Sequence, residues 1–319
     1  MIDLGTLGGN SSSAYAINNR GQIAGWSSTS VVGESHAALY TDGAWHDLST
    51  LGGKISNGYG VNDLGHVVGS SRDLAGHIHA FLWTPEGGMI QLSNIPGTFS
   101  TALGINNSGQ IVGEYKDDTD NKTKGFLWSG GVMTPLTLGG GYGFAHAIND
   151  NGQVTGYGTN SDGFDHAFLY DINSKDMADL GAMGGYYSYS VAWGLNDLGH
   201  VVGRSNFSAN SDDQHAFRYV AGAWTDLGVL SGSRSEAFGI NNRGQIVGES
   251  YAVSGTRIHA FVYADGVMTD LNTLGWTESS ARGINERGQI VGYFTDASGT
   301  RAFLYNPVVS VPSLLLLLE

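Results

Sequence analysis

One phrase returns seven times along this chain, at a spacing of 43 to 47 residues. Its first copy reads Ala-Ile-Asn-Asn-Arg-Gly-Gln-Ile-Ala-Gly over residues 16–25, and its variants begin at Gly60, Gly104, Ala147, Gly194, Gly239 and Gly283. A period of this length indicates that one supersecondary unit is repeated. The repeats take up almost the whole sequence, so we expect one domain over residues 1–305 and a tail over residues 306–319.

Each repeat contains four short runs that are typical of β-strands. The first run is small and alternating, as in residues 279–284, and the second is Gln-Ile-Val-Gly or a near copy. An Asn-x-x-Gly turn joins them, because Asn and Gly tolerate the positive φ of a tight hairpin. The third run is built around His-Ala-Phe, as in residues 79–81, and a short turn with Gly leads to the fourth, as in residues 267–271. Four short antiparallel strands per repeat are what one propeller blade requires.

We therefore predict an all-β fold, a seven-bladed β-propeller with four antiparallel strands per blade. A linear β-solenoid is the alternative, but a solenoid needs atypical capping repeats at its ends. Here Met1–Leu4 matches a fourth run without the first three, and residues 302–305 form a third run without a clear fourth. We expect the N-terminal strand to close the ring, which removes the open sheet edges. Residues 308–311 compete for the same place, and in that case the N-terminal segment would be displaced or would pair with another molecule.

Composition excludes several classes of partner. With 15 Lys and Arg against 29 Asp and Glu, the formal charge of -14 repels nucleic acids and anionic lipid surfaces. The absence of cysteine excludes disulfides and thiolate metal sites. The five leucines of residues 314–318 are too few to cross a bilayer, so we expect no membrane insertion. No signal peptide precedes Met1, and the chain begins inside a repeat, so we expect a form trimmed at its start.

The recurring motifs resemble a known family. His-Ala-Phe at residues 79–81, Gly-Ile-Asn-Asn-Arg-Gly-Gln-Ile-Val-Gly at 239–248 and Asp-Leu-Gly-Thr-Leu-Gly-Gly at 3–9 look like the HAF-repeat family of bacterial extracellular proteins. The likeness covers residues 1–305 and implies export from a bacterial cell, to the medium or the cell surface, but no particular activity. Residues 311–313 before the leucines resemble the start of a PEP-CTERM sorting tail, although the Pro-Glu-Pro and the basic end are missing.

Several recurring polar residues are interpreted as structural. Histidine begins the third run in five repeats, where it is His36, His79, His166, His215 and His259, and Lys124 and Arg301 take its place in the other two. Residues one repeat apart cannot share a metal ion unless they face the ring axis, so we expect hydrogen bonds instead. The aspartates of the fourth run are expected to bond turn amides, and they are Asp3, Asp47, Asp179, Asp226 and Asp270. The turn asparagines, one per repeat, are Asn18, Asn62, Asn106, Asn149, Asn196, Asn241 and Asn285.

Function is expected where the repeats differ, on the rim formed by the loops between second and third runs and by the links between repeats. The links are aromatic, and the ligand-binding candidates are Tyr142, Phe144, Tyr186, Tyr187, Tyr189 and Trp193. Aromatic faces beside carboxylates and amides suit a sugar, so we predict a glycan site there. The alternative is that these rings fill a wider gap between repeats.

The long loops of three consecutive repeats are acidic. Their candidate metal ligands are Asp117, Asp118, Asp120, Asp162, Asp165, Asp212 and Asp213. Clustered carboxylate and amide oxygens match the preference of Ca2+, but no segment follows the twelve-residue calcium loop with its closing Glu. We therefore expect no cofactor, and Ca2+ is the alternative to aspartates that only solvate the loops.

Catalytic motifs are absent: the chain has no Gly-x-Ser-x-Gly, no His-Glu-x-x-His and no Gly-rich phosphate loop with Lys. One position varies from repeat to repeat: it lies two residues before the aliphatic residue that precedes each turn asparagine. Four of the residues found there suit uronate elimination. His146, Tyr15, Tyr59 and Arg282 would supply a base, an acid and a charge clamp over the ring axis. Packing between repeats is the alternative role of these residues.

The sequence thus favours a secreted, non-enzymatic binding module for a carbohydrate, another extracellular ligand or a protein surface. The first alternative is a polysaccharide lyase or glycoside hydrolase that acts at the central channel. The second is a structural protein that assembles by exchange of a terminal strand. We expect a monomer, with strand exchange as the other possibility.

Overall fold

The computed structural model describes residues 1–185, 188–208, 213–252, 257–272 and 275–307. Within these ranges the chain forms 28 β-strands and no helix, hence no apolar helix long enough to cross a membrane. Tyr186, Tyr187 and Asp212 lie outside the described residues, as does the tail from residue 308 onward.

Each of the first six repeats forms four consecutive antiparallel strands, and the last forms three, to which the N-terminal strand adds the fourth. The first strands are β2 (Gly8–Ile17), β6 (Gly52–Val61), β10 (Ser100–Ile105), β14 (Gly139–Ile148), β18 (Ser190–Leu195), β22 (Ser235–Ile240) and β26 (Glu278–Ile284). The second strands are β3 (Ile23–Thr29), β7 (Val67–Asp73), β11 (Ile111–Lys116), β15 (Gln153–Asn160), β19 (Val201–Asn206), β23 (Ile246–Ala252) and β27 (Ile290–Asp296). The third strands are β4 (Ser35–Thr41), β8 (Ile78–Thr84), β12 (Thr123–Ser129), β16 (Asp165–Asp171), β20 (Gln214–Val220), β24 (Arg257–Ala264) and β28 (Gly299–Tyr305). The fourth strands are β5 (Ala44–Asp47), β9 (Gly88–Gln91), β13 (Val132–Leu136), β17 (Met177–Gly181), β21 (Ala223–Asp226), β25 (Val267–Asp270) and, from the N-terminus, β1 (Ile2–Asp3).

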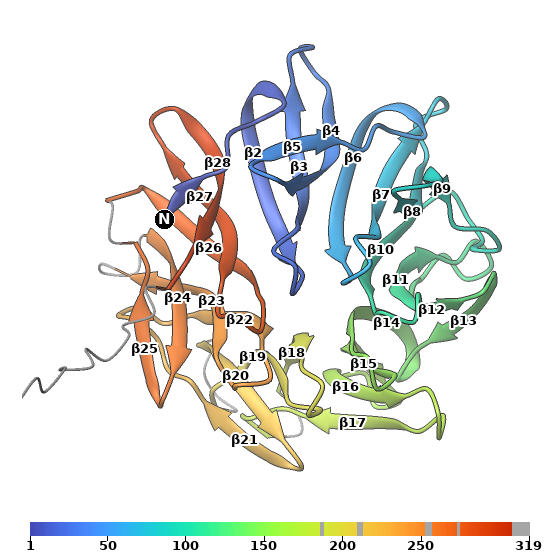
Figure 1. The fold of residues 1–319 in the computed structure, drawn as a ribbon. Helices are drawn as coiled ribbons and strands as arrows, with labels where there is room; N and C mark the ends of the chain where they lie inside the picture. Colours follow the sequence, from blue (N-terminus) through green and yellow to red (C-terminus); the bar gives the residue numbers. More distant parts are fainter. Residues whose placement is uncertain (186–187, 209–212, 253–256, 273–274, 308–319) are drawn as a thin grey trace, which may run out of the picture.

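The strands pair into six sheets. Five of these sheets have four strands, and the sixth has eight because the four-stranded units β2–β5 and β6–β9 are joined by one parallel pair, Ser35 with Ile55. Figure 1 shows the sheets placed around a common centre in sequence order, with the first repeat in blue beside the last in red.

The N-terminal segment belongs to the sheet of the last repeat. Ile2 pairs with Leu304 and Asp3 with Phe303, and the amide of Leu4 donates to the carbonyl of Ala302 at 3.0 Å. The sequence predicted this pairing of Met1–Leu4 with the final repeat. Because β1 is paired within its own chain, it is not a free strand for a second molecule.

The core lies between neighbouring sheets. The Phe of His-Ala-Phe is fully buried in each repeat that carries it or its equivalent; these residues are Phe81, Phe126, Phe168, Phe217, Phe261 and Phe303. Phe261, for example, shares one core cluster with Val202 of the preceding repeat and with Ala237 of its own. Burial of one such ring stabilises the fold by about 1.5–3 kcal/mol, so each third strand holds its repeat against the next.

The turn asparagines do more than shape turns. The side-chain carbonyl of Asn241 accepts from the amides of Arg243 and Gln245, as a turn asparagine should. Its side-chain NH2 also donates to the carbonyl of the next turn asparagine, Asn285, at 3.1 Å. The same bond joins each repeat to the next at 2.8–3.1 Å, and the seventh runs from Asn285 to the carbonyl of Asn18. Each of these asparagines is buried, so the motif recurs because it links repeats.

Candidate functional site

A β-bulge in every first strand turns one side chain toward the central cavity. The register slips by one residue between Ala145 and Ala147, for example, so that His146 has no partner on the second strand. Bulges of this kind re-aim a side chain. The same slip occurs in all seven first strands. We call the bulged residues the lining ring; they are Tyr15, Tyr59, Leu103, His146, Trp193, Phe238 and Arg282.

A glycine opposite each bulge makes it possible. A Cβ on Gly156 would lie 1.8 Å from the carbonyl oxygen of Phe144, far inside van der Waals contact. The last Gly of Gln-Ile-Val-Gly has this environment in every repeat, at 1.8–2.0 Å from a carbonyl oxygen of the first strand. The glycine of the repeat phrase is therefore required by close backbone approach beside the bulge.

The cavity surrounded by the lining ring has a volume of about 390 Å3. At the end where the Asn-x-x-Gly turns lie, it meets a polar ring of one Asn, Asp or Glu per repeat: Asn19, Asp63, Asn107, Asp150, Asp197, Asn242 and Glu286. Each of these side chains accepts the backbone amide of the preceding ring member at 2.8–3.3 Å. The polar ring is thus occupied in holding repeats together.

On one side of the cavity, aromatic rings from consecutive repeats are in contact. We call Phe144, His146, Tyr157, Tyr189 and Trp193 the aromatic cluster. His146 stacks on Trp193 with centroids 4.1 Å apart, and Phe144 stacks on Tyr157 at 4.5 Å. Tyr157 meets the edge of Tyr189 at 6.3 Å. All five are half-buried, so their surfaces are only partly used in packing.

Beside the aromatic cluster lies a charged network of two ion pairs. Arg204 Nε lies 3.2 Å from Glu236 Oε1, and Arg282 Nη2 lies 3.3 Å from Glu249 Oε2. The indole N–H of Trp193 donates to Glu236, which connects the network to the cluster. The Arg282 guanidinium also lies 3.9 Å from the ring centroid of Phe238, a cation–π contact.

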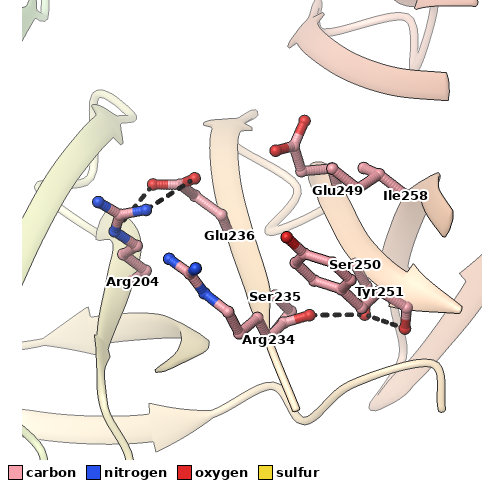
Figure 2. A pocket seen from close by; sticks show the side chains of 8 residues that line it. All are labelled: Arg204, Arg234, Ser235, Glu236, Glu249, Ser250, Tyr251 and Ile258. Atoms are coloured by element: carbon pink, nitrogen blue, oxygen red, sulfur yellow. Dashed lines mark hydrogen bonds and ion pairs between the residues drawn. The ribbon is translucent and has the colours of Figure 1, made fainter. Parts of the chain in front are cut away.

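A side pocket of about 100 Å3 opens on this network between β19, β22, β23 and β24. Figure 2 shows Arg204 and Glu236 facing each other, with Arg234 beside them. Arg234 donates to Gln214 at 2.8 Å, and among the described residues no carboxylate lies within ion-pair distance of it. The side pocket therefore presents one guanidinium that no described carboxylate neutralises.

Burial shifts three titratable groups around the cavity. Burial raises the pKa of Glu114 to about 7 and also raises the pKa of Glu236, against the opposing charge of Arg204. Burial lowers the pKa of His146 to about 4, so its ring is neutral at pH 7. Because His146 Nδ1 lies 2.8 Å from the carbonyl of Ala192, Nδ1 must carry the proton, which leaves Nε2 with a free lone pair.

The structure brings the four catalytic candidates into one cavity. His146, Tyr15, Tyr59 and Arg282 all belong to the lining ring, and the rings of Tyr15 and Tyr59 lie 5.1 Å apart. Burial, with a smaller contribution from Tyr15, raises the pKa of Tyr59 to about 12. Arg282 is already engaged by Glu249, which reduces its use as a clamp for a substrate carboxylate.

The ligand-binding candidates divide into two groups. Phe144, Tyr189 and Trp193 belong to the aromatic cluster. Tyr142 does not: it is exposed and lies under Lys122, whose ammonium is 5.3 Å from its ring centroid. Tyr186 and Tyr187 lie outside the described residues.

The described aspartates of the acidic loops do not gather into a group of three that could share one ion. Lys124 Nζ lies 2.7 Å from Asp117 and 2.8 Å from Asp120, so an ammonium already holds this pair. Asp165 accepts from Thr159, and Asp162 donates its amide to Asn160. Asp118 and Asp213 join no such group either, and Asp212 is outside the described residues.

The structural roles assigned to the recurring His and Asp residues are confirmed in four repeats. His36, His166, His215 and His259 place Nδ1 2.8–3.0 Å from the aspartate of the fourth strand. That aspartate accepts a turn amide as well, as Asp47 does from Ser49 at 2.7 Å. Asp3, in the repeat that carries Arg301 instead of the histidine, likewise accepts the amide of Gly5 at 2.8 Å.

Several residues of the site were missed from the sequence. Glu114, Tyr157, Arg204 and Glu249 follow the last Gly of the Gln-Ile-Val-Gly motif, at a position occupied by Trp26, Ser70 and Tyr293 in the other repeats. Its variation inside an otherwise constant phrase was the available signal. Glu236 lies on the first strand, two residues before the bulge.

Four-stranded antiparallel sheets whose first strands surround a central cavity define a β-propeller. Solved structures agree with this class. The chain is similar to the β-propeller domain of the Trilobed protease from Pyrococcus furiosus, with a TM-score of 0.52, 8% identity, and coverage of 80% of this chain and 84% of that one. It is also similar to the WD40 β-propeller domain of Doa1, with a TM-score of 0.53, 13% identity, and coverage of 95% and 96%.

A third likeness is to a prolyl endopeptidase, with a TM-score of 0.63, 11% identity and coverage of 93% of this chain. The chain spans 50% of the length of that protein. Identities this low show the fold alone. No protein-family model matches the chain, and no curated protein matches it.

Proposed function

We propose that this chain is a carbohydrate-binding module, built as a seven-bladed propeller with a closed ring. Seven four-stranded units, β1 paired with β28 and the bond from Asn285 to Asn18 support the ring. Export from a bacterial cell is part of the proposal and rests on the resemblance to HAF-repeat proteins.

The observation that carries the binding proposal is the aromatic cluster beside the charged network. The C–H faces of a sugar pack on half-buried rings, while its hydroxyls need fixed donors and acceptors. Trp193 and His146 stack beside the cavity. The indole N–H of Trp193 donates to Glu236, which in turn pairs with Arg204. The guanidinium of Arg234 suits a sugar that carries a carboxylate.

Titration with neutral and uronate oligosaccharides, followed by calorimetry and by tryptophan fluorescence, tests the proposal. We expect Trp193→Ala and Tyr157→Ala each to weaken binding about tenfold, the value of one lost ring contact. Arg234→Gln should weaken only the uronates. Tyr142→Ala is the matched control, since this exposed tyrosine lies outside the cluster.

The outcome that would contradict the proposal is unchanged affinity in both cluster variants, or no binding of any oligosaccharide at millimolar concentration. Circular dichroism of each variant separates a lost contact from a lost fold.

One observation favours a second function, elimination on a uronate polysaccharide. Neutral His146 keeps a free lone pair on Nε2, which is what a general base needs. A lyase would produce the absorbance of unsaturated uronates from the wild-type chain and lose it in His146→Gln. No absorbance from the wild type would remove this function and leave the binding proposal intact.

A further inference from the structure

The second repeat departs from the pattern of its four counterparts. In those repeats, the histidine of the third strand places Nδ1 against an aspartate of the fourth strand. In the second repeat the fourth-strand position is Gln91, whose side-chain Nε2 lies 3.1 Å from Nδ1 of His79. His79 instead directs Nε2 to a carboxylate of a different strand, Asp73, at 3.2 Å.

A second histidine stands next to this pair. His77 immediately precedes β8 and lies two residues before His79, and the centroids of the two imidazole rings are 6.1 Å apart. His77 Nδ1 is 3.4 Å from Asp73 Oδ2, the oxygen that also faces His79. Asp73 is fixed in this position because its other oxygen accepts the amide of His77 at 2.9 Å.

The three side chains form a group with metal-ligand geometry. One ligand atom from each lies within 4.8 Å of the other two, and no other such group exists among the described His, Asp and Glu residues. Two ligands at the usual zinc distances, in a tetrahedron, are about 3.3 Å apart. The two observed contacts to Asp73, 3.2 and 3.4 Å, match this edge.

We propose that Asp73, His77 and His79 bind a divalent transition-metal ion, Zn2+ or a close relative, at the hairpin between β7 and β8. Two imidazoles and one carboxylate are a ligand set typical of zinc and of neighbouring first-row ions, with at least one position left open. His79 is mostly buried while His77 is half exposed, so that open position faces solvent.

Gln91 completes the arrangement as a positioning residue. When Nε2 of His79 binds a metal ion, Nδ1 must carry the proton and needs an acceptor. Rotation of the Gln91 amide brings its oxygen to the place now held by its nitrogen, 3.1 Å from Nδ1. An aspartate there, as in the other repeats, would accept the same proton, so the second repeat is set apart by Asp73 and His77 beside Nε2 of His79.

Titration of the full chain with Zn2+ alone, and with Co2+ for its absorption spectrum, tests the site. We expect one equivalent to bind the wild type, and Co2+ to give the visible bands of a four- or five-coordinate ion. His77→Ala and His79→Ala should each weaken binding at least about 100-fold, and Gln91→Ala about tenfold.

The matched control is His36→Ala, which removes the corresponding histidine of the first repeat and should leave the dissociation constant unchanged within about twofold. Because His77 is half exposed, its loss does not threaten the fold, and a circular dichroism spectrum checks this. Equal affinity in wild type and His77→Ala, or no stoichiometric binding by the wild type at micromolar Zn2+, would overturn the proposal.

Discussion

The polar ring at the turn end of the central cavity and the lining ring of its wall are built from the same seven repeats, yet they differ in kind. At the turn end, every repeat contributes an Asn, Asp or Glu that accepts the neighbour's amide. At the lining ring, no two neighbouring repeats other than the first two carry the same residue, and the residue types range from leucine to arginine. The first region shows what each repeat needs in order to join the next; the second shows what the molecule can vary.

The largest effect should come from the turn end. Asn285→Ala removes four side-chain hydrogen bonds, including the one to the carbonyl of Asn18, and should lower the free energy of unfolding by about 4 kcal/mol. Urea unfolding followed by circular dichroism measures this.

Asn241→Ala is the matched variant, because Asn241 makes the same four bonds within the array. Equal losses are expected if the last repeat is joined to the first as firmly as the others are to each other. A clearly smaller loss for Asn285→Ala would argue for an open array.

The next largest effect should be a pH dependence of stability caused by the buried Glu114. Glu114 titrates near 4.5 when exposed and near 7 in the fold. Because the folded pKa is the higher one, the carboxylate form is disfavoured in the fold. The contribution of Glu114 to the free energy of unfolding therefore falls as pH rises from 4.5 to 7 and is constant outside that window.

The free energy of unfolding of Glu114→Gln should therefore rise by about 3 kcal/mol relative to that of the wild type across that range. Unfolding curves of both proteins at matched pH values test it, and the opposite contribution of His146 cancels because both proteins carry it. A pH-independent difference between the two would show that Glu114 is well solvated.

The smallest effect should come from the lining ring itself. Leu103 faces the cavity, so Leu103→Ala should cost below about 1 kcal/mol, since it leaves no new enclosed void. Leu136→Ala, at a fully buried leucine, should cost about 3 kcal/mol in the same assay. Similar losses for both would mean that the lining ring also serves as core.

The repeats, the four strands of each and the place of the N-terminal segment could be read from the sequence, because turn residues and alternation are local signals. The contact between Asp47 and His36 was harder to predict from the sequence, because it depends on the register between the third and fourth strands. The bulge was hidden because a register slip leaves no residue of its own in the sequence. The charged network was hidden for a related reason: Arg204 and Glu236 come from different repeats, 32 positions apart.

The bulge also separates two tasks that most folds combine. A side chain left out of the strand ladder carries no pairing duty, so its identity can change while the hairpin around it stays intact. Seven positions, one per repeat, then decide the shape and polarity of the cavity wall. The selectivity of such a scaffold can therefore be changed one side chain at a time.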